Sequence, residues 1–284
     1  GIKNTLIKNN IYLGKVSRIE PSLQAAFIDF GRERHGFLSF NDIQSDYYQI
    51  PSSDLEKIKE EEKKVREELA KQSEKEEIDN EKSDNDPVEK KLEIENRNEG
   101  QIKQSKAPSK RYKIQEVIKP NQVILVQVLK DERGLKGAAL STFISIAGKY
   151  IVLMPNTPKG GGISRKIFNP ADRKKIRSIL NEIQIPREMG LIVRTAGSNK
   201  TKNEINQDLG TLTNTWDQIK ETALNSIAPS LIHQESEIIK RTIRDMFDDD
   251  TKSIIIEGTE GYKKAQTFMK LIMPSNVKKV KKYR

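Results

Sequence analysis

A segment of mixed charge at positions 52–111 limits more than any other feature how this chain can fold. It holds 18 acidic and 15 basic residues among 60, and no aromatic residue. Its first half places apolar residues among Glu and Lys, at Leu55, Ile58, Val65 and Leu69. This half could form a solvated helix supported by i,i+4 ion pairs. Such pairs rarely hold a helix unaided, so we expect most of the segment to be disordered.

Charge and composition outside that segment narrow the possible kinds of site. The other residues carry a surplus of 13 basic over acidic side chains, so this part is more basic than the chain as a whole. The absence of cysteine excludes disulfides, thiolate zinc sites and a cysteine nucleophile within this sequence. No apolar run approaches the roughly 20 residues that cross a bilayer, so we expect a soluble segment, with both ends cut from a longer chain.

Strand patterns flank the charged segment. Positions 25–30 and 35–40 read as short strands with Gly31 and Gly36 at the bends, after a long alternating run that begins near Asn10. Beyond Tyr112, positions 121–129 and a further run through Phe143 continue the pattern. Closely spaced short strands are typical of a small barrel, here one that the charged segment interrupts.

The second half of the chain alternates between strand and helix patterns, which gives an α+β protein with several domains. The expected order is a strand at 150–154, a Gly-rich loop at 159–162, a helix near 171–180, a strand at 190–193 and a helix around 209–225. From 230 to 271 a strand, a helix, a strand and a helix follow.

Aromatic and basic residues of the barrel form a first candidate site. OB barrels bind single-stranded nucleic acid by stacking bases on strand aromatics while cations follow the backbone. Phe27, Phe37 and Lys136 suit this role, with Arg18 and His35 nearby. Any single Phe in a strand is more often core. Strand alternation, however, places Phe27 and Phe30 on opposite faces of the same strand. One of these two faces is therefore expected to lie on the outside of the barrel.

Two further stretches suit a phosphate. Positions 159–166 combine three glycines with Arg165, and positions 193–197 place Arg194 and Thr195 after an apolar strand. Backbone N–H groups, an Arg fork and a hydroxyl all suit an oxyanion. The Gly-Lys-Ser/Thr ending of a P-loop is missing. Each stretch alone would be an ordinary turn, but together they favour a phosphate site.

Other candidates for chemistry are weak. His35 and His233 lie far apart with no flanking ligand pattern, and the acidic run around Asp245 and Asp248 is more typical of a solvated helix end. No nucleophile elbow or acid–base pair stands out. We therefore expect no catalytic residue and no metal ligand in this chain.

Several co-linear blocks carry a resemblance to a known family. Positions 10–31 and 34–38, 136–145, 150–166, 190–197 and 232–236 resemble, in order, the ribonuclease E/G family. The resemblance covers nearly everything except 52–111. It implies an S-one type OB domain at 10–143, a 5′-monophosphate sensor domain at 144–229 and part of a ribonuclease-H-like fold at 230–284, after a lead-in at 1–9.

The resemblance also implies a function. The family's activity would be that of a bacterial endoribonuclease that cuts single-stranded, A/U-rich RNA in mRNA decay and rRNA and tRNA processing, and prefers a 5′-monophosphate. Phe27, Phe37 and Lys136 would hold RNA. The 5′-phosphate would be bound by a set of five residues: Gly148, Val152, Arg165, Arg194 and Thr195.

Further implications concern the family's longer chains. Magnesium and zinc would be bound beyond residue 284, and the full-length protein would be a homo-oligomer, a possible member of an RNA-degradation complex, in the cytoplasm or at the inner face of the cell membrane. The alternative is a stand-alone, non-catalytic RNA-binding protein. A translation-type S-one module has no place for the sensor-like blocks.

Overall fold

The computed structural model describes residues 7–82, 112–157, 160–235, 238–248 and 250–283. The chain divides into two compact units, one formed by Gly1–Ile43 with Pro120–Arg284 and the other by Gln44–Lys119.

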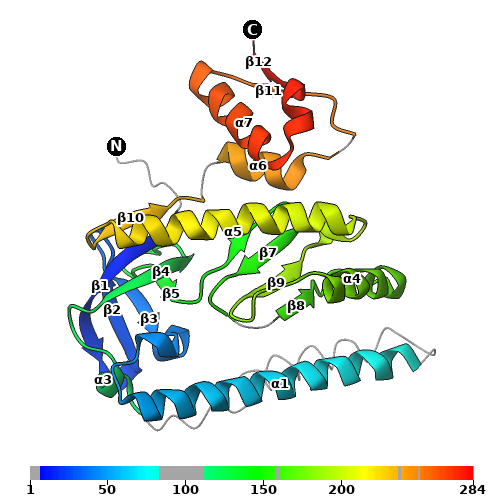
Figure 1. Cartoon of the computed structure of the whole chain (residues 1–284). Coiled ribbons are helices and arrows are strands. Elements are labelled where there is room, and N and C mark those ends of the chain that lie inside the picture. The colour runs from blue at the N-terminus through cyan, green and yellow to red at the C-terminus, as the bar shows by residue number, and fades with distance from the viewer. Residues whose placement is uncertain (1–6, 83–111, 158–159, 236–237, 249, 284) are drawn as a thin grey trace. The chain divides into compact units, whose positions relative to one another are not determined.

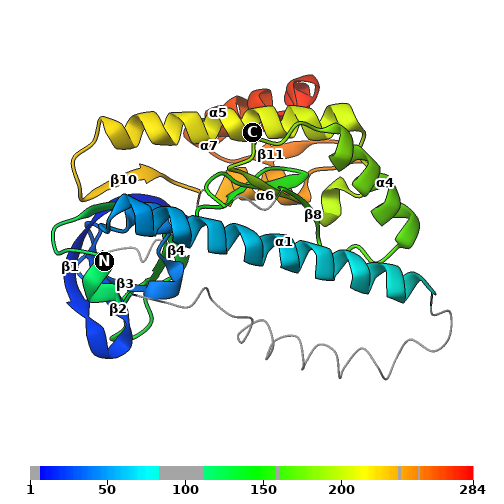
Figure 2. The same ribbon diagram turned by 60° about the horizontal axis from the view of Figure 1, so that its bottom comes forward.

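A closed barrel of five strands forms the first part of the larger unit. The strands are β1 (Ile11–Glu20), β2 (Ala25–Asp29), β3 (Gly36–Ser39), β4 (Val123–Lys130) and β5 (Ala139–Ser141). Their order is β1-β2-β3-β5-β4, and β1 also pairs with β4 to close the ring, which Figure 2 shows at its lower left. The arrangement confirms the expected barrel and is consistent with an OB fold.

Strand β1 is long enough to serve both sides of the closure. Its first half, Ile11 to Lys15, pairs with β4, and its second half pairs with β2 across a register shift between Val16 and Arg18. Such an irregularity bends a strand and increases its twist. The barrel core includes several side chains with at most 1% of their surface exposed: Val16, Ile28, Leu38, Ile124, Val126 and Leu140.

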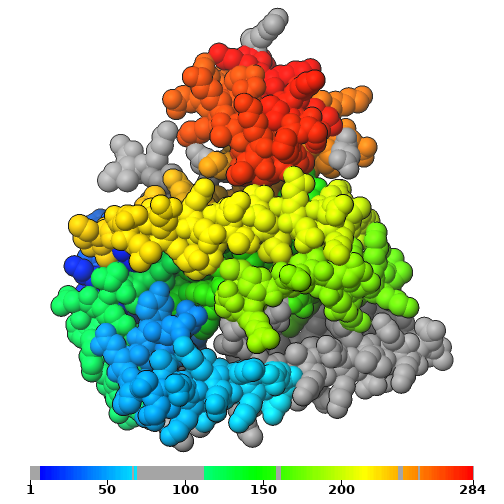
Figure 3. All heavy atoms as spheres, viewed as in Figure 1, coloured from blue at the N-terminus to red at the C-terminus, as the bar shows by residue number. Residues whose placement is uncertain are grey.

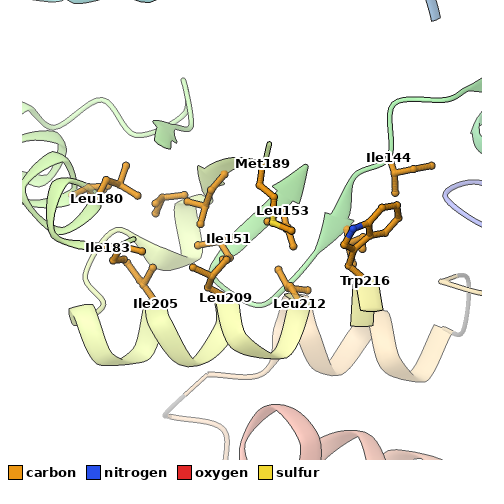
Figure 4. Close-up of a cluster of buried hydrophobic side chains, with 14 of the residues drawn as sticks. Ile144, Ile151, Leu153, Leu180, Ile183, Met189, Ile205, Leu209, Leu212 and Trp216 are labelled. Carbon is orange, nitrogen blue, oxygen red and sulfur yellow. The ribbon is translucent and has the colours of Figure 1, made fainter. Parts of the chain in front are cut away.

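A sheet of four strands follows: β6 (Ile146–Ala147), β7 (Ile151–Met154), β9 (Gly190–Val193) and β8 (Gly160–Ile163), in that order. Helices α4 (Pro170–Glu182) and α5 (Lys202–Leu224) pack against it. Figure 4 shows Leu209 and Leu212 of α5 pointing toward Ile151 and Leu153 of β7, with Ile205 of the same helix near Ile183 and Trp216 near Ile144. The spacing of these α5 residues is that of one helix face.

The prediction of a Gly-rich loop at 159–162 is wrong, because Gly160–Ile163 form strand β8. This strand pairs in parallel with β9, from Gly160 beside Gly190 to Ile163 beside Val193. The backbone groups of β8 that face β9 therefore form a ladder, and the segment is a strand at the edge of the sheet and not a loop. The glycine at 161 has a packing reason, since a Cβ there would lie 3.2–3.3 Å from the side chain of Leu180 in α4.

The last part of the larger unit alternates helices and strands, as expected. Strand β10 (Ser230–His233) adds to the edge of β1, and α6 (Ile238–Met246), β11 (Ile254–Ile256), α7 (Thr259–Ile272) and β12 (Val280–Lys282) follow (Figure 1). Strands β11 and β12 pair in parallel. A small separate core joins α6, β11, α7 and β12, and its buried residues are Ile243, Phe247, Ala265, Met269 and Val280.

The smaller unit contains a helix in the first half of the charged segment, where a solvated helix was considered, so the expectation of disorder is wrong for 52–82. Helix α1 runs over Ser52–Lys82, while positions 83–111 lie outside the described residues. Contacts beyond i,i+4 pairs support the start of α1: Ser45 Oγ donates to Glu62 at 3.2 Å, Lys59 pairs with Asp46 at 2.6 Å, and the Tyr112 hydroxyl donates to Asp54. Sequence reasoning considered neighbours within the helix alone and missed this support.

We expect deletion of 52–111, replaced by a short Gly-Ser turn, to leave the barrel folded and RNA affinity unchanged. The residues on either side of the deleted segment are already close together, because the backbone N–H of Gln49 donates to the carbonyl of Val117 at 2.8 Å. The exposed ion pairs that the deletion removes contribute little to stability. Thermal unfolding and RNA titration would check this. A fall in Tm of more than about 8 °C, equivalent to roughly 2–4 kcal/mol, would contradict it.

Candidate nucleic-acid interface

Two aromatic rings and a cation gather on the barrel. Phe27 of β2 and Phe37 of β3 are direct partners across the strands, and their ring centroids lie 6.0 Å apart in an edge-on arrangement. The Arg18 guanidinium carbon lies 4.8 Å from the centroid of the Phe27 ring. Phe37 is 36% exposed, and Phe27 is half-buried. The group offers an aromatic surface beside a positive charge.

Strand alternation is present as expected. Ile28 and Phe30 are buried in the barrel core, while Phe27 and Asp29 lie on the other face. Lys136 is exposed and lies just before β5. The chain there is held close to β3, because the Phe37 N–H donates to the carbonyl of Ala138 at 2.8 Å. The structure therefore brings Phe27 and Phe37 together and places Lys136 on the segment that enters the neighbouring strand.

Arg194, directly after β9, lies at the centre of the second candidate site. Its guanidinium donates to the carbonyl of Gly148 at 2.6 Å and to an oxygen of Asp245 at 2.9 Å. Its backbone N–H donates to the carbonyl of Tyr150 at 2.8 Å. The side chain is 27% exposed. The Arg194 guanidinium is thus oriented by the 148–151 turn on one side and contacts the Asp245 carboxylate on the other.

The other predicted phosphate residues lie around this turn. Thr195 is exposed and opens a short 3-10 turn, Thr195–Gly197. That turn lies close against the 148–151 turn, because a Cβ on Gly197 would be 2.7 Å from the carbonyl oxygen of Tyr150. Val152 of β7 is half-buried and lies opposite Ile192 of β9. Hydrogen bonding joins Gly148 and Arg194, and Thr195 adjoins them.

Arg165 stands on a separate turn at the same edge of the sheet. Ser164 follows β8, and its N–H donates to the carbonyl of Val193 at 2.9 Å. Arg165 is exposed at the tip of the turn that starts there. Because β8 and β9 are parallel, Arg165 and Arg194 both lie beyond the same end of these strands. Arg165 is the more exposed of the two.

Asp208, which sequence reasoning missed, organises the turn that holds Arg194. Its buried carboxylate accepts the backbone N–H groups of Lys149, Tyr150 and Ile151 at 3.2, 2.8 and 3.1 Å. A Cβ on Gly148 would lie 2.5–2.8 Å from that carboxylate. Burial raises the pKa of Asp208, and the three N–H groups and Arg194 oppose the rise. The signal in the sequence was a carboxylate on the apolar face of α5, between Ile205 and Leu209.

Asp245 is the second missed residue. The acidic run that contains it was expected to face water past a helix end, but Asp245 lies within α6 and pairs with both Arg194 and Arg244, at 2.9 and 3.0 Å. Burial opposes its ionisation, but hydrogen bonds from the two arginines outweigh burial and lower the pKa of Asp245. Arg244 is itself held by Glu235 at 2.7 Å. No local pattern in the sequence indicates a pair 51 positions apart.

A metal site and a membrane span were both sought in the described part of the chain. Within it, no three His, Cys, Asp or Glu side chains come together in a way that could hold a metal ion. None of the helices described there is both long and apolar enough to cross a membrane.

Comparison with known proteins identifies the family. A profile of the ribonuclease E/G family matches residues 145–284. Ribonuclease E of Haemophilus influenzae is 37% identical over 276 residues, which is 97% of this chain and 24% of that protein. This chain belongs to the ribonuclease E/G family. Ribonuclease E of Escherichia coli K12 is 38% identical over 88% of the chain, and that of Buchnera aphidicola from Acyrthosiphon pisum is 36% identical over 97%.

The ribonuclease E/G matches cover both candidate sites. The family profile includes Gly148, Arg194 and Asp245, and the relatives that match 97% of the chain extend the similarity into the barrel. The chain spans about a quarter of the length of these relatives, and 18% of the protein from E. coli.

Proposed function

We propose that this chain is the RNA-binding and 5′-end-sensing portion of an endoribonuclease that cleaves single-stranded, A/U-rich RNA. The observation that carries the proposal is the pair of Phe27 and Phe37 with Arg18, displayed on the outside of a barrel in a ribonuclease E/G family member. Bases stack on such rings with little regard to sequence, while the cation contacts the backbone. Lys136 adds a second positive charge on the neighbouring segment.

The Arg194 site supports sensing of the 5′ end. An oxygen of the Asp245 carboxylate takes the place that a phosphate oxygen would occupy on the guanidinium. A terminal phosphate can displace this partner, because Asp245 keeps its contacts with Arg244 when Arg194 turns to the ligand. Thr195 supplies a hydroxyl and Arg165 a second cation, while Gly148 and Val152 line the turn and strand beside them. Charge-assisted bonds of this kind are the strong ones.

The proposal leaves cleavage to parts of the protein outside this chain. The described residues do not fit the magnesium or the zinc of the family, because they offer no cluster of ligands, and the sequence has no cysteine. We therefore assign the chain binding and orientation of RNA, and no catalytic residue. Oligomerisation, membership of an RNA-degradation complex, roles in mRNA decay and rRNA and tRNA processing, and a location in the cytoplasm or at the inner membrane face belong to the same proposal.

Comparing three 5′ ends on one short RNA tests the sensing function. We expect RNA with a 5′-monophosphate to bind more tightly than RNA with a 5′-hydroxyl or a 5′-triphosphate. A site sized for one phosphate excludes the triphosphate, whereas electrostatic attraction to a basic surface alone would favour the triphosphate, which carries more charge. Arg194→Ala should remove the difference, at a cost of about 1.5–3 kcal/mol, or about 10- to 150-fold in Kd. Fluorescence anisotropy at a single salt concentration measures this.

The matched control is Arg187→Ala, which removes one exposed arginine from the loop before β9, at the end of that strand away from Arg194. It should weaken binding of all three RNAs equally and slightly. Equal affinity of the unaltered chain for all three ends would reject the sensing function and leave a general RNA-binding protein.

A further inference from the structure

An exposed aromatic residue lies on the turn between β8 and α4. Phe168 is 76% exposed, although burying a Phe side chain is worth about 1.5–3 kcal/mol. Its neighbour Ile167 is buried in the core of the sheet. On its other side, Asn169 caps α4 by accepting the N–H of Ala171 at 2.9 Å. Both neighbours are fixed, so the backbone presents the ring outward.

The turn before Phe168 is held rigidly. The N–H of Ile167 donates to the carbonyl of Ser164 at 3.1 Å, which closes a four-residue turn. The Arg173 guanidinium donates to that same carbonyl at 3.3 Å and to the carbonyl of Ile167 at 3.2 Å. An aromatic side chain with two torsions on a fixed backbone loses little entropy when a ligand covers it.

Basic residues flank the ring along the sequence. Arg165 and Lys166 occupy the two central positions of the turn, and both are exposed. Over positions 165–177 the chain carries six basic residues and one acidic residue, Asp172, and Figure 3 shows α4, in yellow-green, at the surface. A single aromatic ring among cations is the composition of a site for single-stranded nucleic acid. Protein interfaces instead bury a core in which charged residues are depleted.

The turn also lies close to the Arg194 site. Ile163 of β8 is beside Val193 of β9, and the next N–H, that of Ser164, donates to the carbonyl of Val193 at 2.9 Å. The Cα atoms at the ends of a four-residue turn lie within about 7 Å, and one more residue adds about 3.8 Å. The Cα of Phe168 is therefore within about 11 Å of that of Ser164. The ring is therefore within reach of the first few nucleotides of an RNA whose 5′ end is bound at Arg194.

We propose that Phe168, with Arg165 and Lys166, forms a second base-stacking surface, which binds a nucleobase of single-stranded RNA close to its 5′ end. This surface is distinct from the Phe27–Phe37 pair on the barrel. Its position along the RNA rests on the proposed function of Arg194, whereas the stacking contact itself needs no terminal phosphate.

The test uses short 5′-monophosphorylated RNAs that carry 2-aminopurine at one of the first four positions, titrated with the 284-residue chain. At one position we expect the fluorescence quenching that accompanies stacking. Phe168→Ala should abolish that signal and weaken binding about 5- to 150-fold. Phe168→Tyr should keep both, and Phe168→Leu should lose the signal although it remains apolar. Leu224→Ala, which removes another exposed apolar side chain, at the end of α5, should change neither.

An abasic nucleotide at the responsive position gives an independent check. It should weaken binding by the unaltered chain to the level of Phe168→Ala and have no added effect on that variant. If the monophosphate preference is present but Phe168→Ala changes neither signal nor affinity, the stacking surface is rejected and the sensing function stands. If no end is preferred and Phe168→Ala still weakens every RNA, the surface stands and the sensing function fails. Unchanged RNA binding with a loss of self-association in sedimentation would assign the ring to a protein interface and overturn the proposal.

Discussion

Asp208→Ala is expected to destabilise the protein by at least about 3 kcal/mol. The substitution leaves the buried N–H groups of Lys149, Tyr150 and Ile151 without their acceptor, and each such loss costs about 1–3 kcal/mol. For a protein of this size the fall in Tm should be at least about 6 °C. Asp208→Asn should lie between, since it keeps one acceptor oxygen and turns an amide N–H₂ toward a donor.

The matched control lies on the same helix. Asp217 is exposed on α5, with Lys220 at 3.1 Å as its partner, and Asp217→Ala should change stability by less than about 0.5–1 kcal/mol. Chemical denaturation of both variants measures the difference. If Asp208→Ala proves as mild as Asp217→Ala, then water replaces the carboxylate and the 148–151 turn does not depend on it.

Asp208→Asn also tests the geometry of the Arg194 site. Gly148, whose carbonyl accepts from Arg194, stands against the Asp208 carboxylate. Loss of that carboxylate should release the turn and with it the orientation of the guanidinium. Well below its Tm, Asp208→Asn should therefore lose part of the discrimination between RNA ends and retain the affinity for RNA with a 5′-hydroxyl.

Phe27→Ala and Phe37→Ala are each expected to weaken binding of single-stranded RNA by about 1–3 kcal/mol. Because the two rings touch each other at a centroid distance of 6.0 Å, the double variant should lose less than the sum of the two. Neither ring belongs to the barrel core, so Tm should change little. Titration with a 5′-hydroxyl RNA isolates this contact from any effect of the terminal phosphate.

A core phenylalanine serves as the control. Phe30 is 1% exposed, so Phe30→Leu should lower stability while RNA affinity, measured well below Tm, stays close to that of the unaltered chain. A large fall in Tm for Phe27→Ala or Phe37→Ala, with RNA affinity unchanged, would show that these rings support the barrel and do not bind RNA.

Predictions from local patterns succeeded for most strands and helices. Period-two alternation predicted that Phe27 and Ile28 lie on opposite faces of β2, because successive side chains of any strand point to opposite faces; the structure shows that the face with Ile28 is the buried one. The helix expected around 209–225 is present as α5, whose observed start at Lys202 lies earlier than the expected one. Capping by Thr201 with Glu204 sets that start, a short-range signal that the hydrophobic pattern alone does not contain.

Predictions failed where a segment takes its structure from a distant partner. Three consecutive glycines have little strand preference of their own, yet Gly160–Ile163 form β8 because β9 offers a ladder in parallel register. In the same way, the first turns of α1 are supported by Asp46 and Tyr112, which lie outside the helix.

The sequence by itself determined the barrel, the alternation of helices and strands, the excess of basic charge, and the choice of Phe27, Phe37, Arg194 and Thr195 as candidates. These follow from neighbours within a few positions, where spacing settles which face a side chain takes. Only the tertiary structure decided that Asp208 holds the turn at Gly148 and that Asp245 meets Arg194. Those contacts join residues about 50 to 60 positions apart, and it is the packing of α5 and α6 that brings them within hydrogen-bonding distance.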